Sequence, residues 1–258
     1  MHRFEEPCIS GQNGSGAIFF SGCNLRCAFC QNRKISRENF GREVSVKRLS
    51  EIFCRLEQSG VNNINLVTPG HFAPAIKAAL SLCRPSIPVV YNCGGYESVE
   101  TLKSLSGNIQ IYLPDMKYSD SGLARQVSGA EDYPGIAKAA ISEMFGQVGP
   151  CKFDENGILQ SGVVVRHLVL PGFLENSYRV IDWFADAFEK GSVLFSLMSQ
   201  YTPPKNKLPV KSLNRRLTTL EYNRVYDYML SKGVEFGYCQ QRSSAKEEYT
   251  PDFDLSGF

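Results

Sequence analysis

The sequence lacks long apolar runs, since none of its segments approaches the roughly 18 consecutive apolar residues that a membrane span requires. Neither sign of charge dominates, because 28 basic residues balance 26 acidic ones and leave a formal charge of +2. The overall charge therefore favours neither nucleic acid nor a membrane surface as a partner, although it is compatible with a local basic patch. The first residues contain no apolar core like that of a signal peptide, so we expect a soluble, cytoplasmic protein.

Internal repeats, low-complexity tracts and composition breaks are also missing from the 258 residues. A hydrophobic content of 43% is enough to bury a sizeable core. We therefore expect one domain over residues 1–258, with its core in residues 15–240 and a polar tail over residues 242–258.

Short apolar runs alternate with helical patterns along the chain. The runs predicted to be strands cover residues 17–20, 64–67, 87–91, 109–113, 163–170 and 193–198. The predicted helices follow Ser45, begin near residues 73, 98, 120 and 175, and follow Thr218, and a turn at 154–157 predicts a small hairpin. This α/β alternation predicts parallel strands in a partial (β/α)6-type barrel, with an open doubly wound sheet as the alternative. In both architectures the chemistry gathers at the carboxyl ends of the strands.

Three of the nine cysteines fall within eight residues, directly after the first predicted strand: Cys23, Cys27 and Cys30. In the spacing CxxxCxxC, three thiolates can ligate three irons of a [4Fe–4S] cluster and leave the fourth iron with an open position. The alternative, a structural zinc site, needs a fourth ligand. Its nearest candidates, Cys8 and His71, belong to no second paired motif, so the pattern favours the cluster.

The other cysteines are scattered, so no second cluster is expected. Cys54 and Cys83 fall on predicted helices, where a buried free cysteine behaves as a small hydrophobic residue. Cys93 follows the third predicted strand and is expected to be a turn residue.

The cysteine loop, with Phe29 before its last cysteine, resembles the radical S-adenosylmethionine superfamily. Within this superfamily, the chain resembles most closely a subgroup described as homologues of pyruvate formate-lyase activating enzyme. This resemblance extends over essentially its whole length. The stretches that carry this resemblance are residues 5–11, 19–23, 30–32, 112–118 and 165–172.

The resemblance implies an oxidoreductase with one [4Fe–4S] cluster and S-adenosylmethionine as cofactors. Its reaction is reductive cleavage of S-adenosylmethionine to a 5′-deoxyadenosyl radical, which abstracts hydrogen from a substrate. The implied partners are a low-potential electron donor, flavodoxin or ferredoxin-like, and a protein substrate in which a glycyl radical is made. One alternative is radical modification of a small molecule or peptide. Another, from a different class, is a metal-binding scaffold protein that uses the cysteine loop structurally.

The resemblance also implies residues that contact S-adenosylmethionine, among them Phe29. Relatives carry a Gly-Gly-Glu-like stretch after the second strand to meet the methionine amino group. Here residues 68–70 read Thr-Pro-Gly, so recognition of the amino group would rely on backbone carbonyls or on Thr68, and the alternative is a plain turn that ends the strand. Asn92 matches the position of a polar ligand to the methionyl group. Gln200 and Tyr201, at the end of the last predicted strand, are candidates for contact with adenine or substrate.

Asp115 and Lys117 resemble an Asp-x-Lys element in which the lysine approaches the methionyl carboxylate. Alternating strand residues share a face, so both side chains can point inward, and an ion pair between them is compatible with this role. Arg166 lies in an apolar strand, where a buried guanidinium needs a partner such as a ligand carboxylate or Asp115. His167 points to the opposite face and is expected to be structural.

Overall fold

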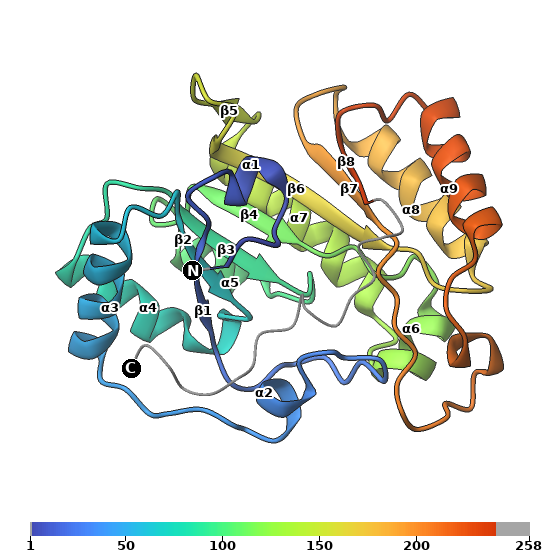
Figure 1. The fold of residues 1–258 in the computed structure, drawn as a ribbon, viewed down its shortest axis with the longest axis horizontal. Helices are drawn as coiled ribbons and strands as arrows, with labels where there is room; N and C mark the ends of the chain where they lie inside the picture. The colour runs from blue at the N-terminus through green and yellow to red at the C-terminus, as the bar shows by residue number, and fades with distance from the viewer. Residues whose placement is uncertain (1, 241–258) are drawn as a thin grey trace.

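The computed structural model describes residues 2–240 and contains one mainly parallel sheet. The strands pair in the order β1-β2-β3-β4-β6-β7-β8, and every pair in this series is parallel. Their bounds are β1 Gly16–Phe19, β2 Ile64–Val67, β3 Val89–Cys93, β4 Ile111–Pro114, β6 Leu159–Leu168, β7 Leu194–Met198 and β8 Gly237–Cys239. Over the described residues β1 and β8 do not pair, so the sheet is open (Figure 1).

Helices connect the parallel strands, as the alternating pattern predicts. The long ones are α3 Val46–Gln58, α4 Ala73–Leu82, α6 Ser121–Ser128, α7 Tyr133–Val148, α8 Leu174–Ala187 and α9 Thr219–Ser231. The short ones are α1 Pro7–Ser10, α2 Arg33–Arg37, α5 Val99–Ser104 and the 3-10 turns η1 Gly70–Phe72 and η2 Lys211–Asn214. The side chains of Ser45 and Thr218 cap α3 and α9, which satisfies N–H groups that each first turn leaves unpaired. Within residues 2–240, no helix combines the length and apolar character needed to cross a membrane.

The two faces of the sheet pack against different partners. One face, with side chains such as Leu66 and Val165, joins the crossover helices in the main hydrophobic core. The other face carries a smaller apolar cluster that includes Val164 and Leu194 of the sheet and Ile9 of α1. Because strand residues alternate between faces, the second cluster is the interior of the partial barrel, and α1 lies over it (Figure 1).

Most predicted elements are present, with three differences. The third strand extends to Cys93, so the prediction that Cys93 is a turn residue is wrong, and Asn92 also lies inside β3. Strand β8 has only three residues and no apolar run, and α1 and α2 are single turns without helical periodicity, so the sequence pattern did not reveal them. The predicted hairpin is confirmed, because β5 (Lys152–Phe153) pairs antiparallel with β6. The predicted tail over residues 242–258 lies outside the described residues.

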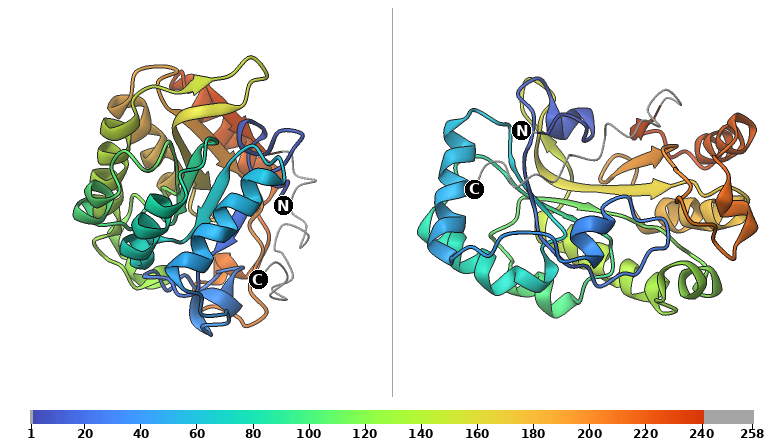
Figure 2. Two further views of the ribbon diagram at one scale, coloured as in Figure 1. Left: turned by 90° about the vertical axis from the view of Figure 1, so that its left-hand side faces the viewer. Right: turned by 60° about the horizontal axis from the view of Figure 1, so that its bottom comes forward.

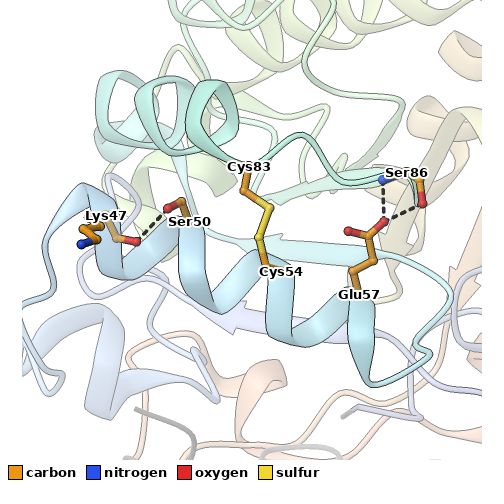
Figure 3. The surroundings of a disulfide bond; sticks show 6 residues. All are labelled: Lys47, Ser50, Cys54, Glu57, Cys83 and Ser86. Carbon is orange, nitrogen blue, oxygen red and sulfur yellow. Dashed lines mark hydrogen bonds between the residues drawn. A yellow bond between two sulfur atoms is a disulfide. The ribbon is translucent and has the colours of Figure 1, made fainter.

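Cys54 and Cys83 form a disulfide that links α3 to the end of α4 (Figure 3). The prediction that both are free, buried cysteines is wrong: each is half-buried and bonded to the other. They are 29 residues apart in sequence, and packing of α3 beside α4 reduces their Cα–Cα distance to 6.5 Å. A second link joins the same segments, because Glu57 accepts hydrogen bonds from the amide and hydroxyl of Ser86.

We expect the Cys54–Cys83 disulfide to stabilise the fold. Closing a loop of this size restricts the unfolded chain, so a Cys54→Ser/Cys83→Ser variant should lose roughly 3 kcal/mol of unfolding free energy. Urea unfolding with and without a thiol reductant measures this, and reductant should destabilise the wild type but not the variant. Cys151→Ser, at a free half-buried cysteine, is the control and should respond to reductant as the wild type does. An equal response of the double variant would contradict the prediction.

Candidate functional site

The cysteine loop follows β1 at the carboxyl edge of the sheet. Its start is fixed by Gly22, which has a left-handed φ of 88° and donates from its amide to Ile35 O at 2.9 Å. Its middle runs along the end of α6, where the amides of Arg26 and Ala28 donate to the carbonyls of Ser128 and Val127 at 3.1 and 2.8 Å. The backbone of the loop is therefore held at both the α2 and the α6 sides.

Cys23, Cys27 and Cys30 are all free and half-buried. Burial raises the pKa of Cys23. Among residues 2–240, no three His, Cys, Asp or Glu side chains converge closely enough to hold a metal ion. The donor set nevertheless suits a [4Fe–4S] cluster, because three thiols from one anchored loop are available to three irons.

Two buried hydroxyl groups contact the middle cysteine of the loop. The Ser128 hydroxyl donates to Cys27 Sγ at 3.1 Å, and Tyr118 Oη lies 2.7 Å from Ser128 Oγ. Both residues are almost fully buried, with 2% and 0% exposure. Hydrogen bonds to a sulfur ligand orient it and alter its electronic properties, so these two residues support Cys27.

A polar layer lies inside the partial barrel, centred on the Arg166 guanidinium of β6. Its Nε donates to Asp115 Oδ1 at 3.0 Å, its Nη1 to Glu5 Oε2 at 3.2 Å and its Nη2 to Asn92 Oδ1 at 2.5 Å. Lys117 Nζ donates to the other oxygen of Asp115. The structure thus brings together the predicted site residues Asn92, Asp115, Lys117 and Arg166, and gives Arg166 the Asp115 partner that its burial required.

Opposite charges keep Asp115 ionised. Burial by itself raises the pKa of Asp115, but Lys117 and Arg166 outweigh it and hold the pKa below its ordinary value. For Lys117, burial lowers the pKa, and Asp115 reverses this and raises it above the usual range. The pKa of Glu5 is raised by burial, which Arg166 only partly offsets.

Three side chains from outside the barrel interior hold the backbone that carries Asp115 and Lys117. The Tyr133 hydroxyl donates to Asp115 O at 2.7 Å and accepts from the Lys117 amide at 2.9 Å. Asn176 Nδ2 donates to Lys117 O at 3.0 Å. His167 is fully buried, with Nδ1 2.7 Å from Met116 O, which agrees with the structural role expected for it.

The turn after β2 contains Thr68 in a left-handed conformation with φ 58°. Its amide donates to Asn92 O at 2.8 Å, which connects the turn to β3. Glu97 lies close to Gly70 of this turn and accepts a hydrogen bond at 2.8 Å from the hydroxyl of Tyr91, a residue of β3 that belongs to the main hydrophobic core. Burial raises the pKa of Glu97 to about 7.

Phe29 lies on another side of the loop, with its ring in edge contact with Tyr201 at a centroid distance of 5.5 Å. Tyr201 is buried and donates to Leu213 O, so its hydroxyl is already used within the protein. The roles of Phe29 and Thr68 toward a cofactor stay predictions. Sequence reasoning missed Glu5 as a partner of Arg166, and only the stretch at residues 5–11, noted for its resemblance, pointed to it.

Comparisons with known proteins address the cluster and the fold. Residues 9–85, which include the cysteine loop, match the family model described as "4Fe-4S single cluster domain". An uncharacterized protein of Methanocaldococcus jannaschii is 28% identical over 225 residues, which cover 83% of this chain and 61% of that protein. The chain therefore spans about three fifths of the length of this curated relative.

Solved structures share the fold at low sequence identity. SuiB of Streptococcus suis has a TM-score of 0.57 and 13% identity, and the match covers 87% of this chain and 49% of SuiB. SuiB bound to S-adenosylmethionine gives 0.54, with 15% identity and coverage of 91% and 49%. Methylornithine synthase (PylB) gives 0.53, with 15% identity and coverage of 84% and 62%.

These matches confirm the predicted [4Fe–4S] cluster and the predicted α/β partial barrel. Residues 9–85 thus match a cluster domain, and most of the chain shares the fold of these solved structures.

We expect His167 to make stability depend on pH. Burial lowers its pKa from 6.5 to about 4, so the neutral form is favoured in the folded protein. Its contribution is fully present above pH 6.5 and is lost as the pH falls toward 4, by about 1.4 kcal/mol per pH unit. Urea unfolding at several pH values should show a smaller slope in His167→Gln than in the wild type. Equal slopes in the two proteins would contradict this.

We expect Lys117 and Arg166 to differ when each is replaced by methionine. Removing Arg166 leaves Glu5 buried without its main partner and Asp115 with Lys117 alone, and should cost about 3–5 kcal/mol of stability. In Lys117→Met, Asp115 keeps Arg166, so stability and iron content should stay near the wild type. If Lys117 binds the methionyl carboxylate, affinity for S-adenosylmethionine should fall by roughly one to two orders of magnitude. Thermal unfolding and equilibrium titration on the same samples test both, and unchanged affinity in Lys117→Met would remove it from the site.

Proposed function

We propose that this chain is a radical S-adenosylmethionine enzyme that reductively cleaves S-adenosylmethionine to a 5′-deoxyadenosyl radical. One observation carries the proposal: the 4Fe–4S single-cluster match includes a three-cysteine loop at the carboxyl edge of a parallel sheet. We assign Cys23, Cys27 and Cys30 as the cluster ligands. Three protein ligands leave one iron with an open position, which distinguishes a reactive metal site from a closed structural one.

The bound cluster supplies one low-potential electron, and the residues of the chain bind and orient the cofactor. Lys117 is the side chain that we assign to the methionyl carboxylate, and Asp115 holds its ammonium group in place. Asn92 and Arg166 form the rest of the polar layer that contains Asp115 and Lys117. Thr68 and the carbonyls of its turn are assigned to the amino group. We assign Phe29 to contact with the nucleoside part of S-adenosylmethionine.

We further propose that the substrate is a protein in which the enzyme generates a glycyl radical. The resemblance to homologues of pyruvate formate-lyase activating enzyme supports this choice over a small molecule or peptide. We also propose a cytoplasmic location and reduction by a low-potential donor. The cytoplasm keeps most thiols reduced, as iron ligation by the loop cysteines requires, and the Cys54–Cys83 disulfide is an exception that has to resist reduction there.

Anaerobically reconstituted protein should contain about four irons per chain. With a strong reductant it should slowly convert S-adenosylmethionine to 5′-deoxyadenosine without any substrate. Replacing Cys23, Cys27 or Cys30 with alanine should remove both the visible cluster absorption and this cleavage. Cys239→Ala, at an exposed free cysteine of β8, is the control and should keep both. Iron analysis, visible spectra and chromatography of the nucleoside products provide the measurements.

Two results would overturn the proposal. A colourless protein containing zinc would indicate a structural use of the cysteine loop. Formation of S-adenosylhomocysteine in place of 5′-deoxyadenosine would indicate methyl transfer.

A further inference from the structure

Positive charge is concentrated in the segment that contains the cysteine loop and continues to the first turns of α3. Residues 24–48 contain seven Lys or Arg side chains and two Glu side chains, a net charge of +5. The rest of the chain then has 21 basic and 24 acidic residues, a net charge of −3. The overall charge of +2 therefore hides a strong local asymmetry.

Most of these cationic side chains are exposed. The exposed ones, which we call the basic rim, are Arg26, Arg33, Lys34, Arg37, Arg42 and Lys47. Their segment runs from the cysteine loop through α2 to the start of α3, along the lower edge of the molecule in Figure 1 and in front of the sheet in the right view of Figure 2. The basic rim is thus continuous with the loop assigned to the cluster.

Two of these cationic side chains have contacts in the described part of the chain that leave their charge exposed. Arg33 lies 3.9 Å from Glu38, but both side chains are more than 60% exposed, so the pair is weak. Arg37 donates to the carbonyl of Cys27 at 3.2 Å, which places one guanidinium directly on the loop. Charges on an exposed surface of one sign accelerate association with a partner of opposite sign.

We infer that the basic rim is the docking surface for an acidic one-electron carrier protein. The inference rests on the proposed function, because only an enzyme that must be reduced needs such a carrier. An electron donor has to approach the cluster closely, and residues 24–48 are the part of the chain joined directly to its ligands. Complementary charge steers such a partner and selects its orientation.

The composition of the rim favours a protein over a nucleic acid. Proteins that bind single strands place exposed aromatic rings between their cationic residues so that bases can stack. In residues 24–48 the two aromatic residues are Phe29 and Phe40. Phe29 packs against Tyr201, and the Lys34 ammonium lies 3.9 Å from the Phe40 ring centroid. Neither ring forms an open stacking platform.

Charge reversal on the full-length, reconstituted enzyme tests the inference. The test variant is R33E/R42E/K47E, which avoids the cysteine loop and the Arg37 contact. The matched control, K103E/K190E/R224E, reverses three exposed cationic residues elsewhere on the surface. The readout is the rate of cluster bleaching by photoreduced flavodoxin, an acidic carrier, and separately by dithionite.

We expect the test variant to be reduced by flavodoxin about tenfold more slowly than the wild type at low ionic strength. This difference should largely disappear in about 1 M salt, where the Debye length is only about 3 Å. The control variant should react as the wild type does. In about 1 M salt, where the charge of the dithionite anion is also screened, dithionite should reduce all three proteins equally. If cluster reduction is slower only in the test variant and only with flavodoxin as the reductant, the result supports the basic rim as the docking surface.

Other outcomes overturn the inference. Equal flavodoxin rates in the wild type and the test variant, or equal slowing in the control, would remove the basic rim as the docking surface. A single-stranded oligonucleotide that binds the wild type, fails to bind the test variant and blocks flavodoxin would reassign the surface to nucleic acid. If dithionite reduces the cluster of no protein, or S-adenosylmethionine is never cleaved, the proposed function itself fails, and this is visible independently of the flavodoxin rates.

Discussion

The buried guanidinium of Arg166 is the interaction on which the interior of this protein depends. It joins the N-terminal segment through Glu5, β3 through Asn92 and the end of β4 through Asp115. A buried charge is tolerated only when it is paired and hydrogen-bonded, so these three segments have to meet at one place. Lys117 joins the same network through Asp115 and carries it toward the cysteine loop.

The surroundings of this network make the site rigid before any cofactor arrives. Tyr133 and His167 fix the backbone from Asp115 to the amide of Lys117 from the helix-covered face of the sheet. The cysteine loop is tied to α6, and the Ser128 hydroxyl contacts Cys27. The proposed cleavage of S-adenosylmethionine requires such positioning, because the protein supplies orientation while the cofactors supply the reactivity.

At the same edge of the molecule, charge is distributed differently inside and outside the barrel. Inside the barrel, cations and carboxylates are paired and largely neutralise each other. Outside, residues 24–48 carry an excess of positive charge beside the loop. The paired charges inside the barrel suit the binding of a polar cofactor. The exposed charge of one sign suits a transient protein partner, because exposed charges contribute little to stability but alter association rates.

The sequence by itself determined the α/β class, most strand positions and the cysteine loop, because periodicity and short-range spacing encode these features. It also predicted that Asp115 and Lys117 form an ion pair, although both lie beyond β4, which ends at Pro114, so strand alternation is not what brings them together. Only the tertiary structure decided the Cys54–Cys83 bond, the place of Glu5 beside Arg166 and the position of Glu97 against Gly70. In each case the partners are separated by 27 to 161 residues. Contacts over such separations depend on how helices and strands pack against one another. The local sequence pattern does not predict that packing.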